Sequence, residues 1–224
     1  FIGCVRELQN TQPGIWGFPE LAQLLRRPAA AMCEGMRHHY PRGAALVANA
    51  ARIAANSPPL VEGVDYVTIP NGQPLDPANG QVEVAEVFGY VCPACGAFAP
   101  RMSAWKARLP ADVRVSYVPV AFGKAWEPYA KAFYAAEAKG LVDKTHDAVF
   151  NAIHLQRSMP VGANTGAADL APFYAQYGVD AKRFADAYNS FGVDAKINRA
   201  RQFAVKSGVE GTPSIVVNGK YLVP

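Results

Sequence analysis

The clearest hydrophobic pattern in the chain covers residues 81–90, where the run QVEVAEVFGY predicts a β-strand. Side chains alternate between the two faces of a strand, which puts Val82, Val84, Glu86 and Phe88 on one face and Ala85 and Val87 on the other. Both faces are largely apolar, which is typical of a central strand that is covered on two sides. We therefore expect this strand to lie in the middle of a sheet.

A helix and a second strand are predicted directly after this segment. The helix should run from near Cys92 to about Arg108. Pro93 fits its first turn, where a missing N–H costs nothing, and Pro100 should kink it. Residues 113–120 (VRVSYVPV) predict the next strand, so the order strand, helix, strand implies a parallel pair with a right-handed connection.

The remainder of the chain predicts a helical block and a closing hairpin. Helical periodicity marks the segments 125–139, 142–156, 166–177 and 193–207, with Gly140 and Gly178 as stops. Two short strands, 214–217 and 221–223, flank Asn218-Gly219, a dipeptide typical of a two-residue hairpin turn. A further short strand is predicted at 65–69.

These elements predict an α/β fold with an inserted helical subdomain. Residues 56–122 and 208–224 would form the α/β domain, because the helical block 123–207 is too long for a simple connection between strands. Residues 1–55 lack sustained periodicity and contain no Lys. We expect them to be a poorly ordered or signal-like N-terminal extension.

Composition narrows the function classes. The net charge is +4, but residues 1–55 hold six Arg and three acidic residues, so the rest of the chain is nearly neutral. A nearly neutral body argues against a nucleic-acid-binding protein, which normally carries a concentrated basic face. Four cysteines are too few for a disulfide-stapled scaffold of this length, and no apolar run is long enough for a transmembrane helix.

The candidate chemistry lies in the run Cys92-Pro93-Ala94-Cys95. A thiolate is the reactive form of cysteine, and the N-terminus of a helix stabilises it through free N–H groups and the helix dipole. Cys92 is therefore the predicted nucleophile, and Cys95, one turn further on, the buried resolving partner. A C-x-x-C run is also half of a zinc site or a structural disulfide, but no second pair follows, so no metal is expected.

Aromatic and histidine side chains elsewhere are interpreted as structural. Phe98, Met102 and Trp105 have helical spacing after the cysteine pair and are predicted core residues. His146 and His154 are eight residues apart, so they can share a helix face. Neither has a carboxylate or cysteine at ligand spacing, and both are interpreted as ordinary helix residues.

Two separated motifs, VEVAEVFGYVCPAC at 82–95 and GTPSIVVNGKY at 211–221, resemble the thioredoxin superfamily and within it the DsbA-type disulfide oxidases. The resemblance covers roughly residues 64–224 and implies a thioredoxin fold with the helical insertion. It implies a redox role for Cys92 and Cys95, and places Pro93 and Ala94 in the dipeptide that tunes their potential.

The resemblance also assigns residues around the pair. Pro213 matches the family's cis-proline beside the active site, and the backbone of Thr212 before it would bind the substrate peptide. Glu86 stands six residues before Cys92, where the family places a buried acid that could relay protons to Cys95. The alternative for Glu86 is a strand-end acid that points to solvent.

As function, the resemblance implies an enzyme that introduces disulfides into reduced or unfolded proteins in the periplasm. Its reoxidation would depend on a membrane quinone-linked partner of the DsbB type; no cofactor and no nucleic acid are expected, and we expect a monomer. Two positions depart from the familiar pattern: Ala94 replaces a His that would favour the Cys92 thiolate, and Thr212 replaces a Val.

Three other functions compete with the oxidase. A disulfide isomerase or reductase of the same superfamily would use the same pair, although isomerases carry an N-terminal dimerisation domain that residues 1–55 do not resemble. A kappa-type glutathione transferase shares the helical insertion but uses a Ser-centred site. A non-catalytic peptide-binding module would hold an inert disulfide at the helix start.

Overall fold

The structure, a computed structural model, describes residues 60–77 and 79–223. The predicted extension 1–55, with Cys4 and Cys33, lies outside these residues. In chain order the elements are β1 (Val67–Thr68), β2 (Val82–Phe88), α4 (Pro93–Lys106), β3 (Val113–Pro119), α5 (Glu127–Glu137), α6 (Val142–His154), α7 (Ala167–Ala175), α8 (Ala181–Tyr188), α9 (Phe191–Lys206), β4 (Ser214–Val217) and β5 (Tyr221–Val223).

The strands form one mixed sheet in the order β1-β5-β4-β2-β3. β2 pairs in parallel with β3, so that Glu86 lies opposite Tyr117, and pairs antiparallel with β4 on its other side. β4 and β5 form an antiparallel hairpin. The central position of β2, the parallel pair and the closing hairpin are confirmed. Asn218 and Gly219 join the hairpin with φ values of 50° and 65°, in the left-handed region that this turn requires.

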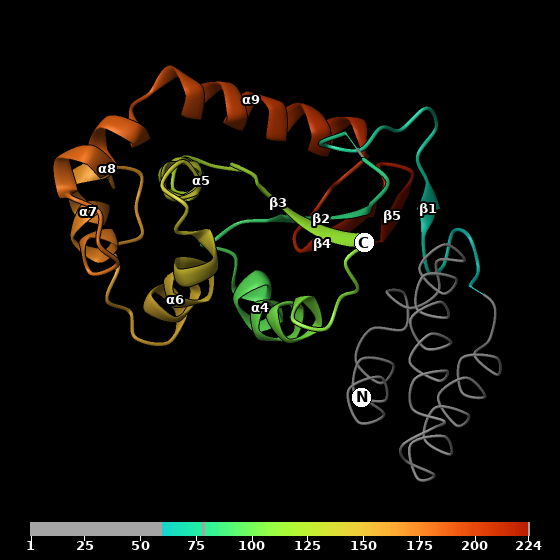
Figure 1. The fold of residues 1–224 in the computed structure, drawn as a ribbon, viewed down its shortest axis with the longest axis horizontal. Helices are drawn as coiled ribbons and strands as arrows, with labels where there is room; N and C mark the ends of the chain where they lie inside the picture. Colours follow the sequence, from blue (N-terminus) through green and yellow to red (C-terminus); the bar gives the residue numbers. More distant parts are fainter. Residues whose placement is uncertain (1–59, 78, 224) are drawn as a thin grey trace, which may run out of the picture.

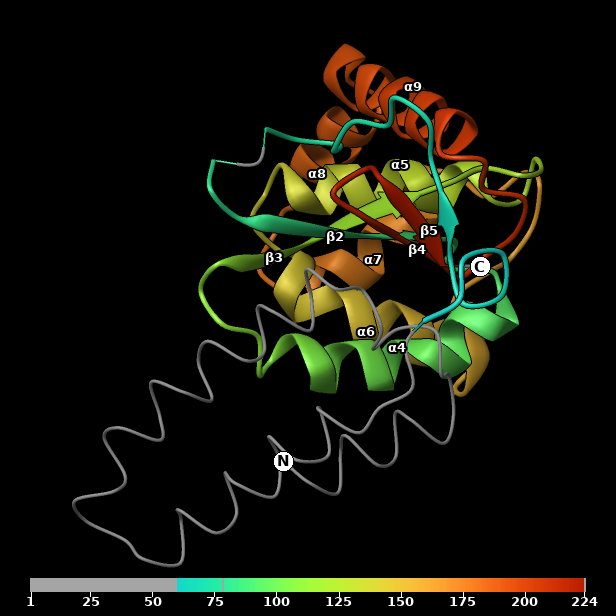
Figure 2. The same ribbon diagram turned by 90° about the vertical axis from the view of Figure 1, so that its right-hand side faces the viewer.

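Helices cover both faces of the sheet. α4 lies against one face with α6 beside it, while α9 lies over the other face (Figures 1 and 2). The apolar residues of β2 from Val84 to Phe88 are almost inaccessible to solvent because of this double cover. Phe98, Met102 and Trp105 of α4 form a buried cluster with Val84, which confirms the core prediction for that helix.

The helical block between β3 and β4 contains five helices in the described residues, where the sequence predicts four. The missed helix is α8, which has eight residues. Its signals are the N-cap Asp180, whose carboxylate accepts the Arg183 N–H at 3.1 Å, and the spacing of Phe184 and Tyr188 on one face. Such a short helix depends on packing, here of Phe184 against Tyr174 with a centroid distance of 4.4 Å.

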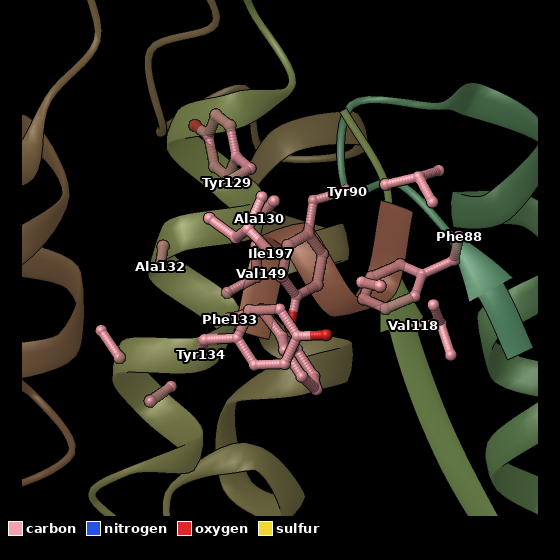
Figure 3. Close-up of a cluster of buried hydrophobic side chains, with 14 of the residues drawn as sticks. Phe88, Tyr90, Val118, Tyr129, Ala130, Ala132, Phe133, Tyr134, Val149 and Ile197 are labelled. Atoms are coloured by element: carbon pink, nitrogen blue, oxygen red, sulfur yellow. The ribbon is translucent and has the colours of Figure 1, made fainter. Parts of the chain in front are cut away.

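An aromatic cluster joins the end of β2 to the helical block. In Figure 3, Phe88 and Tyr90 lie beside Phe133 of α5. His146 of α6 completes the cluster, since its Nδ1 lies 3.0 Å from the Tyr90 hydroxyl. Burial lowers the pKa of His146 to about 3, so the imidazole is neutral near neutral pH and its Nδ1 shares a hydrogen bond with the Tyr90 hydroxyl. This contact fixes Tyr90, which stands two residues before Cys92.

A buried carboxylate that the sequence interpretation missed connects three segments. Glu83 on β2 is 0% exposed. Its carboxylate accepts hydrogen bonds from the Ser116 hydroxyl at 2.8 Å and the Leu75 N–H at 2.6 Å, and pairs with Arg114 at 2.9 Å. The backbone of Glu83 exchanges two hydrogen bonds of 2.8 Å with Asn218. Glu83 thus ties β3, the loop before β2 and the hairpin turn together.

Replacing Glu83 by Ala is expected to lower the free energy of unfolding by about 3 kcal/mol, because it removes the acceptor of the partly buried Arg114 side chain and of the partly buried Leu75 N–H. Urea unfolding measures the change. The exposed Glu210 serves as control, since Glu210→Ala should change stability by less than about 0.5 kcal/mol. Equal effects of the two substitutions would contradict the structural role of Glu83.

Candidate active site

Cys92 lies at the position where β2 has ended and α4 begins. It is the N-cap residue of α4, with φ −78° and ψ 118°, and Pro93 follows at the start of the helix as predicted. The Sγ of Cys92 accepts the backbone N–H of Cys95 at 3.4 Å. No acidic residue occupies the first turn of α4, so nothing there opposes the positive end of the helix dipole.

The two thiols differ in burial and acidity, and both are free in this structure. Burial raises the pKa of Cys92, but hydrogen bonds with the side chain of Thr212, with the backbone N–H and thiol of Cys95 and with the backbone N–H of Ala94 outweigh it, so the pKa is lowered overall. Burial raises the pKa of Cys95 to about 12. The sulfur of Cys92 therefore ionises more readily, and the thiol of Cys95 keeps its proton.

The loop before β4 brings a distant segment to the cysteine pair. The Thr212–Pro213 peptide bond is cis, as the resemblance implies. The Cys92 thiol donates to the Thr212 carbonyl at 3.5 Å, a contact across 120 residues. Pro93 and Ala94, which follow Cys92 in the chain, are exposed. The structure thus brings both sequence motifs together around one sulfur atom.

Glu86 is fully buried in β2, at 0% exposure, so it does not point to solvent. Neither of its carboxylate oxygens has a hydrogen-bond partner among the described residues. Burial, with a smaller contribution from the charge of Asp147, raises its pKa from 4.5 to about 8. Glu86 is therefore largely protonated near neutral pH, on the strand that leads into the turn before Cys92.

Two residues of the helical block contact this turn, and the sequence interpretation missed both contacts. The Nε2 of His154 lies 2.7 Å from the Tyr90 carbonyl oxygen. The indole ring of Trp126 lies so close to Gly89 that a Cβ there would come within 2.1 Å of it. No local pattern reports such contacts, because the partners lie 64 and 37 residues apart. The interpretation of His154 as an ordinary helix residue therefore leaves out its place at the site.

Within residues 60–77 and 79–223, no three His, Cys, Asp or Glu side chains gather as metal ligands would. None of the described helices is long and apolar enough to cross a membrane.

Comparison with known proteins decides the family. The family model described as DSBA-like thioredoxin domain matches residues 127–224. A thiol:disulfide interchange protein DsbA from Burkholderia cepacia is 38% identical over 173 residues, covering 77% of this chain and 80% of that protein. The chain belongs to the DsbA family. Its α/β fold is accordingly the thioredoxin fold with a helical insertion, and it is a thiol–disulfide oxidoreductase.

Other DsbA proteins agree with this assignment. The DsbA of Pseudomonas aeruginosa strain PAO1 is 36% identical, over 75% of this chain and 78% of that protein. The crystal structure of the oxidoreductase DsbA from Xylella fastidiosa has a TM-score of 0.71 and 45% identity, covering 74% of this chain and 88% of that one. The similarity therefore extends over both motifs and the helical block.

Proposed function

We propose that this DsbA-family chain introduces disulfide bonds into reduced proteins of the bacterial periplasm by exchange at Cys92 and Cys95. The observation that carries the proposal is that the pKa of the Cys92 thiol is lowered while the pKa of the Cys95 thiol is raised. The lowered pKa of Cys92 stabilises the reduced form of the pair, and a stabilised reduced form makes the disulfide a stronger oxidant. This favours the oxidase over the isomerase and the reductase.

The exchange proceeds in two steps that balance. A substrate thiolate attacks the Cys92 sulfur of the disulfide, the Cys92–Cys95 bond breaks, and Cys95 leaves and takes up a proton. A second substrate thiolate then attacks the substrate sulfur of the mixed disulfide, which forms the substrate disulfide and releases Cys92 as a thiolate. The substrate loses two electrons and the cysteine pair gains them.

Three further residues support these steps. Glu86 holds a proton near neutral pH that it can pass to the leaving sulfur of Cys95, directly or through water. Thr212 and Pro213 lie beside the Cys92 sulfur, where the backbone of Thr212 can bind an extended peptide. A quinone-linked membrane partner of the DsbB type would return the pair to the disulfide; the family assignment supports this partner. The proposed enzyme acts as a monomer and uses no bound cofactor.

Redox equilibration with glutathione tests the direction of the reaction. We expect a potential well above the value of about −270 mV that is typical of thioredoxin, a reductase. Mass spectrometry of samples quenched with an alkylating reagent gives the oxidised fraction at each glutathione ratio. A potential at or below that value would exclude the oxidase and leave the reductase.

Alkylation of the reduced protein tests whether Cys92 is reactive at all. We expect iodoacetamide at pH 6 to 7 to modify Cys92 at least about tenfold faster than an unperturbed thiol, because more of it is ionised. Cys95 should stay unmodified in the folded protein, since its pKa is about 12 and its side chain is buried. An inert Cys92 would instead identify a non-catalytic peptide-binding module.

A further inference from the structure

The segment that leads into Cys92 is a tight turn whose carbonyl groups need partners. The Cys92 N–H donates to the Gly89 carbonyl at 3.0 Å, which closes the turn over Tyr90 and Val91. The Tyr90 carbonyl is bonded by His154, the last residue of α6, at 2.7 Å. A carbonyl oxygen only accepts, so Nε2 of His154 carries the hydrogen in this contact.

His154 also contacts the chain on the other side of Cys92. A Cβ at Gly96 would come within 2.6 Å of Cδ2 of His154, so only a glycine leaves room for the imidazole there. The Gly96 N–H donates in turn to the Cys92 carbonyl at 3.1 Å. Phe150, one turn earlier on α6, stacks on the imidazole at 6.1 Å and 24° and holds the ring in place. One side chain thus touches the turn before the nucleophile and the helical turn after it.

Both histidines of α6 contact Tyr90. His146 bonds the hydroxyl of Tyr90 and His154 bonds its carbonyl oxygen. Their separation of eight residues, which predicts a shared helix face, is what lets one helix reach both ends of Tyr90. The redox turn is therefore anchored to the inserted helical subdomain through this tyrosine.

We propose that His154 is a positioning residue for the redox pair, which holds the turn before Cys92 so that the reduced form with its thiolate is favoured. The proposal rests on the function proposed above and adds a residue from the helical block to it. The N–H of His154 satisfies the Tyr90 carbonyl two residues before Cys92, and an unpaired carbonyl there would leave the turn free to shift away from the geometry that supports the thiolate. The dipeptide of this chain has Ala94 and no imidazole, and the imidazole that contacts the turn before Cys92 comes from His154 of α6.

A role in redox chemistry differs from a role in stability alone. A hydrogen bond that is equally strong in the oxidised and the reduced protein stabilises both forms and leaves the potential unchanged. A bond that supports the thiolate stabilises the reduced form more, so its loss lowers the potential. The potential is therefore the readout that separates the two roles.

The test compares His154→Ala with His154→Gln in the complete chain. Glutathione equilibration gives the potential, and the ultraviolet absorbance of the thiolate against pH gives the pKa of Cys92. For His154→Ala we expect a shift of roughly tenfold in the equilibrium constant toward the disulfide, about 30 mV for two electrons, and a higher Cys92 pKa. His154→Gln should recover most of both values, because the amide nitrogen can donate to the same carbonyl.

Two further variants complete the design. Gly96→Ala should displace the imidazole and lower the potential in the wild-type chain, but have little further effect beside His154→Ala, where the ring is absent. Asn151→Ala, at an exposed position one turn earlier on α6, should leave the potential unchanged. A stability loss that is equal in both redox states, with an unchanged potential, would overturn the proposal. A wild-type protein without oxidase activity would overturn the proposed function instead.

Discussion

Cys92→Ser is expected to abolish disulfide exchange, with a loss of at least about a thousandfold in the rate at which a reduced test protein is oxidised. The hydroxyl of Ser cannot form the mixed disulfide, and Cys95 cannot replace Cys92 because it is 0% exposed and its pKa is about 12. Recovery of activity by a reduced, unfolded test enzyme measures the rate.

The partner substitution should give a different result. Cys95→Ser keeps the nucleophile but removes the second thiol, so the variant cannot form the Cys92–Cys95 disulfide and cannot oxidise the reduced test protein. Mixed with an oxidised, disulfide-containing protein, its Cys92 thiolate should attack that disulfide, and the mixed disulfide should accumulate and be visible by mass spectrometry, because no Cys95 thiol is present to release it. Ala97→Ser, which places the same hydroxyl at an exposed position of α4, is the matched control and should retain near wild-type activity. If Cys92→Ser still oxidised the test protein, Cys92 would not be the residue that forms the mixed disulfide.

Glu86→Gln is expected to stabilise the protein at alkaline pH by about 5 kcal/mol relative to the wild type. The pKa of Glu86 is raised from 4.5 in the unfolded chain to about 8 in the folded protein. The folded state therefore holds the proton more tightly, and its stability is full below pH 4.5 and falls as the pH rises to about 8. Glutamine fills the same space without a charge, so it does not lose this stability.

Urea unfolding of the oxidised proteins at pH 5 and pH 8.5 measures this difference, because no cysteine of the pair titrates in the disulfide. The advantage of Glu86→Gln should be small at pH 5 and large at pH 8.5. His146 acts in the opposite direction: its pKa is lowered to about 3, so its contribution is lost as the pH falls below 6.5. That loss affects both proteins equally and cancels in the comparison.

A matched control separates burial from charge in this experiment. Glu210→Gln removes a carboxylate at an exposed position and should change stability by less than about 0.5 kcal/mol at either pH. A stability difference for Glu86→Gln that stayed constant between pH 5 and pH 8.5 would mean that Glu86 titrates as it does in water.

Much of the architecture could be predicted from local pattern. The apolar alternation of 81–90 predicted a central strand, because a strand covered on two faces has no room for charge except where a specific pocket receives it. Asn218-Gly219 predicted the hairpin, since Asn and Gly are among the few residues that adopt the left-handed backbone conformation with little strain. Gly140 and Gly178 marked helix ends for the same reason, and have φ values of 67° and 89°.

The nucleophile could also be predicted from sequence, because the acidity of Cys92 depends on its position at a helix start, which Pro93 and the C-x-x-C spacing mark. The placement of Thr212 and Pro213 beside it came from resemblance alone. Spacing along the chain carries no information on a contact across 120 residues.

Only the tertiary structure decided how the buried polar groups are satisfied. Two glutamates three residues apart on β2 are both 0% exposed. The carboxylate of Glu83 has hydrogen-bond and ion-pair partners, whereas neither carboxylate oxygen of Glu86 has a hydrogen-bond partner among the described residues. His154 reaches the redox turn only because α6 packs beside α4. Hydrophobic period fixes which residues are buried, but the free energy of a buried polar group depends on atoms that other segments bring within about 3 Å.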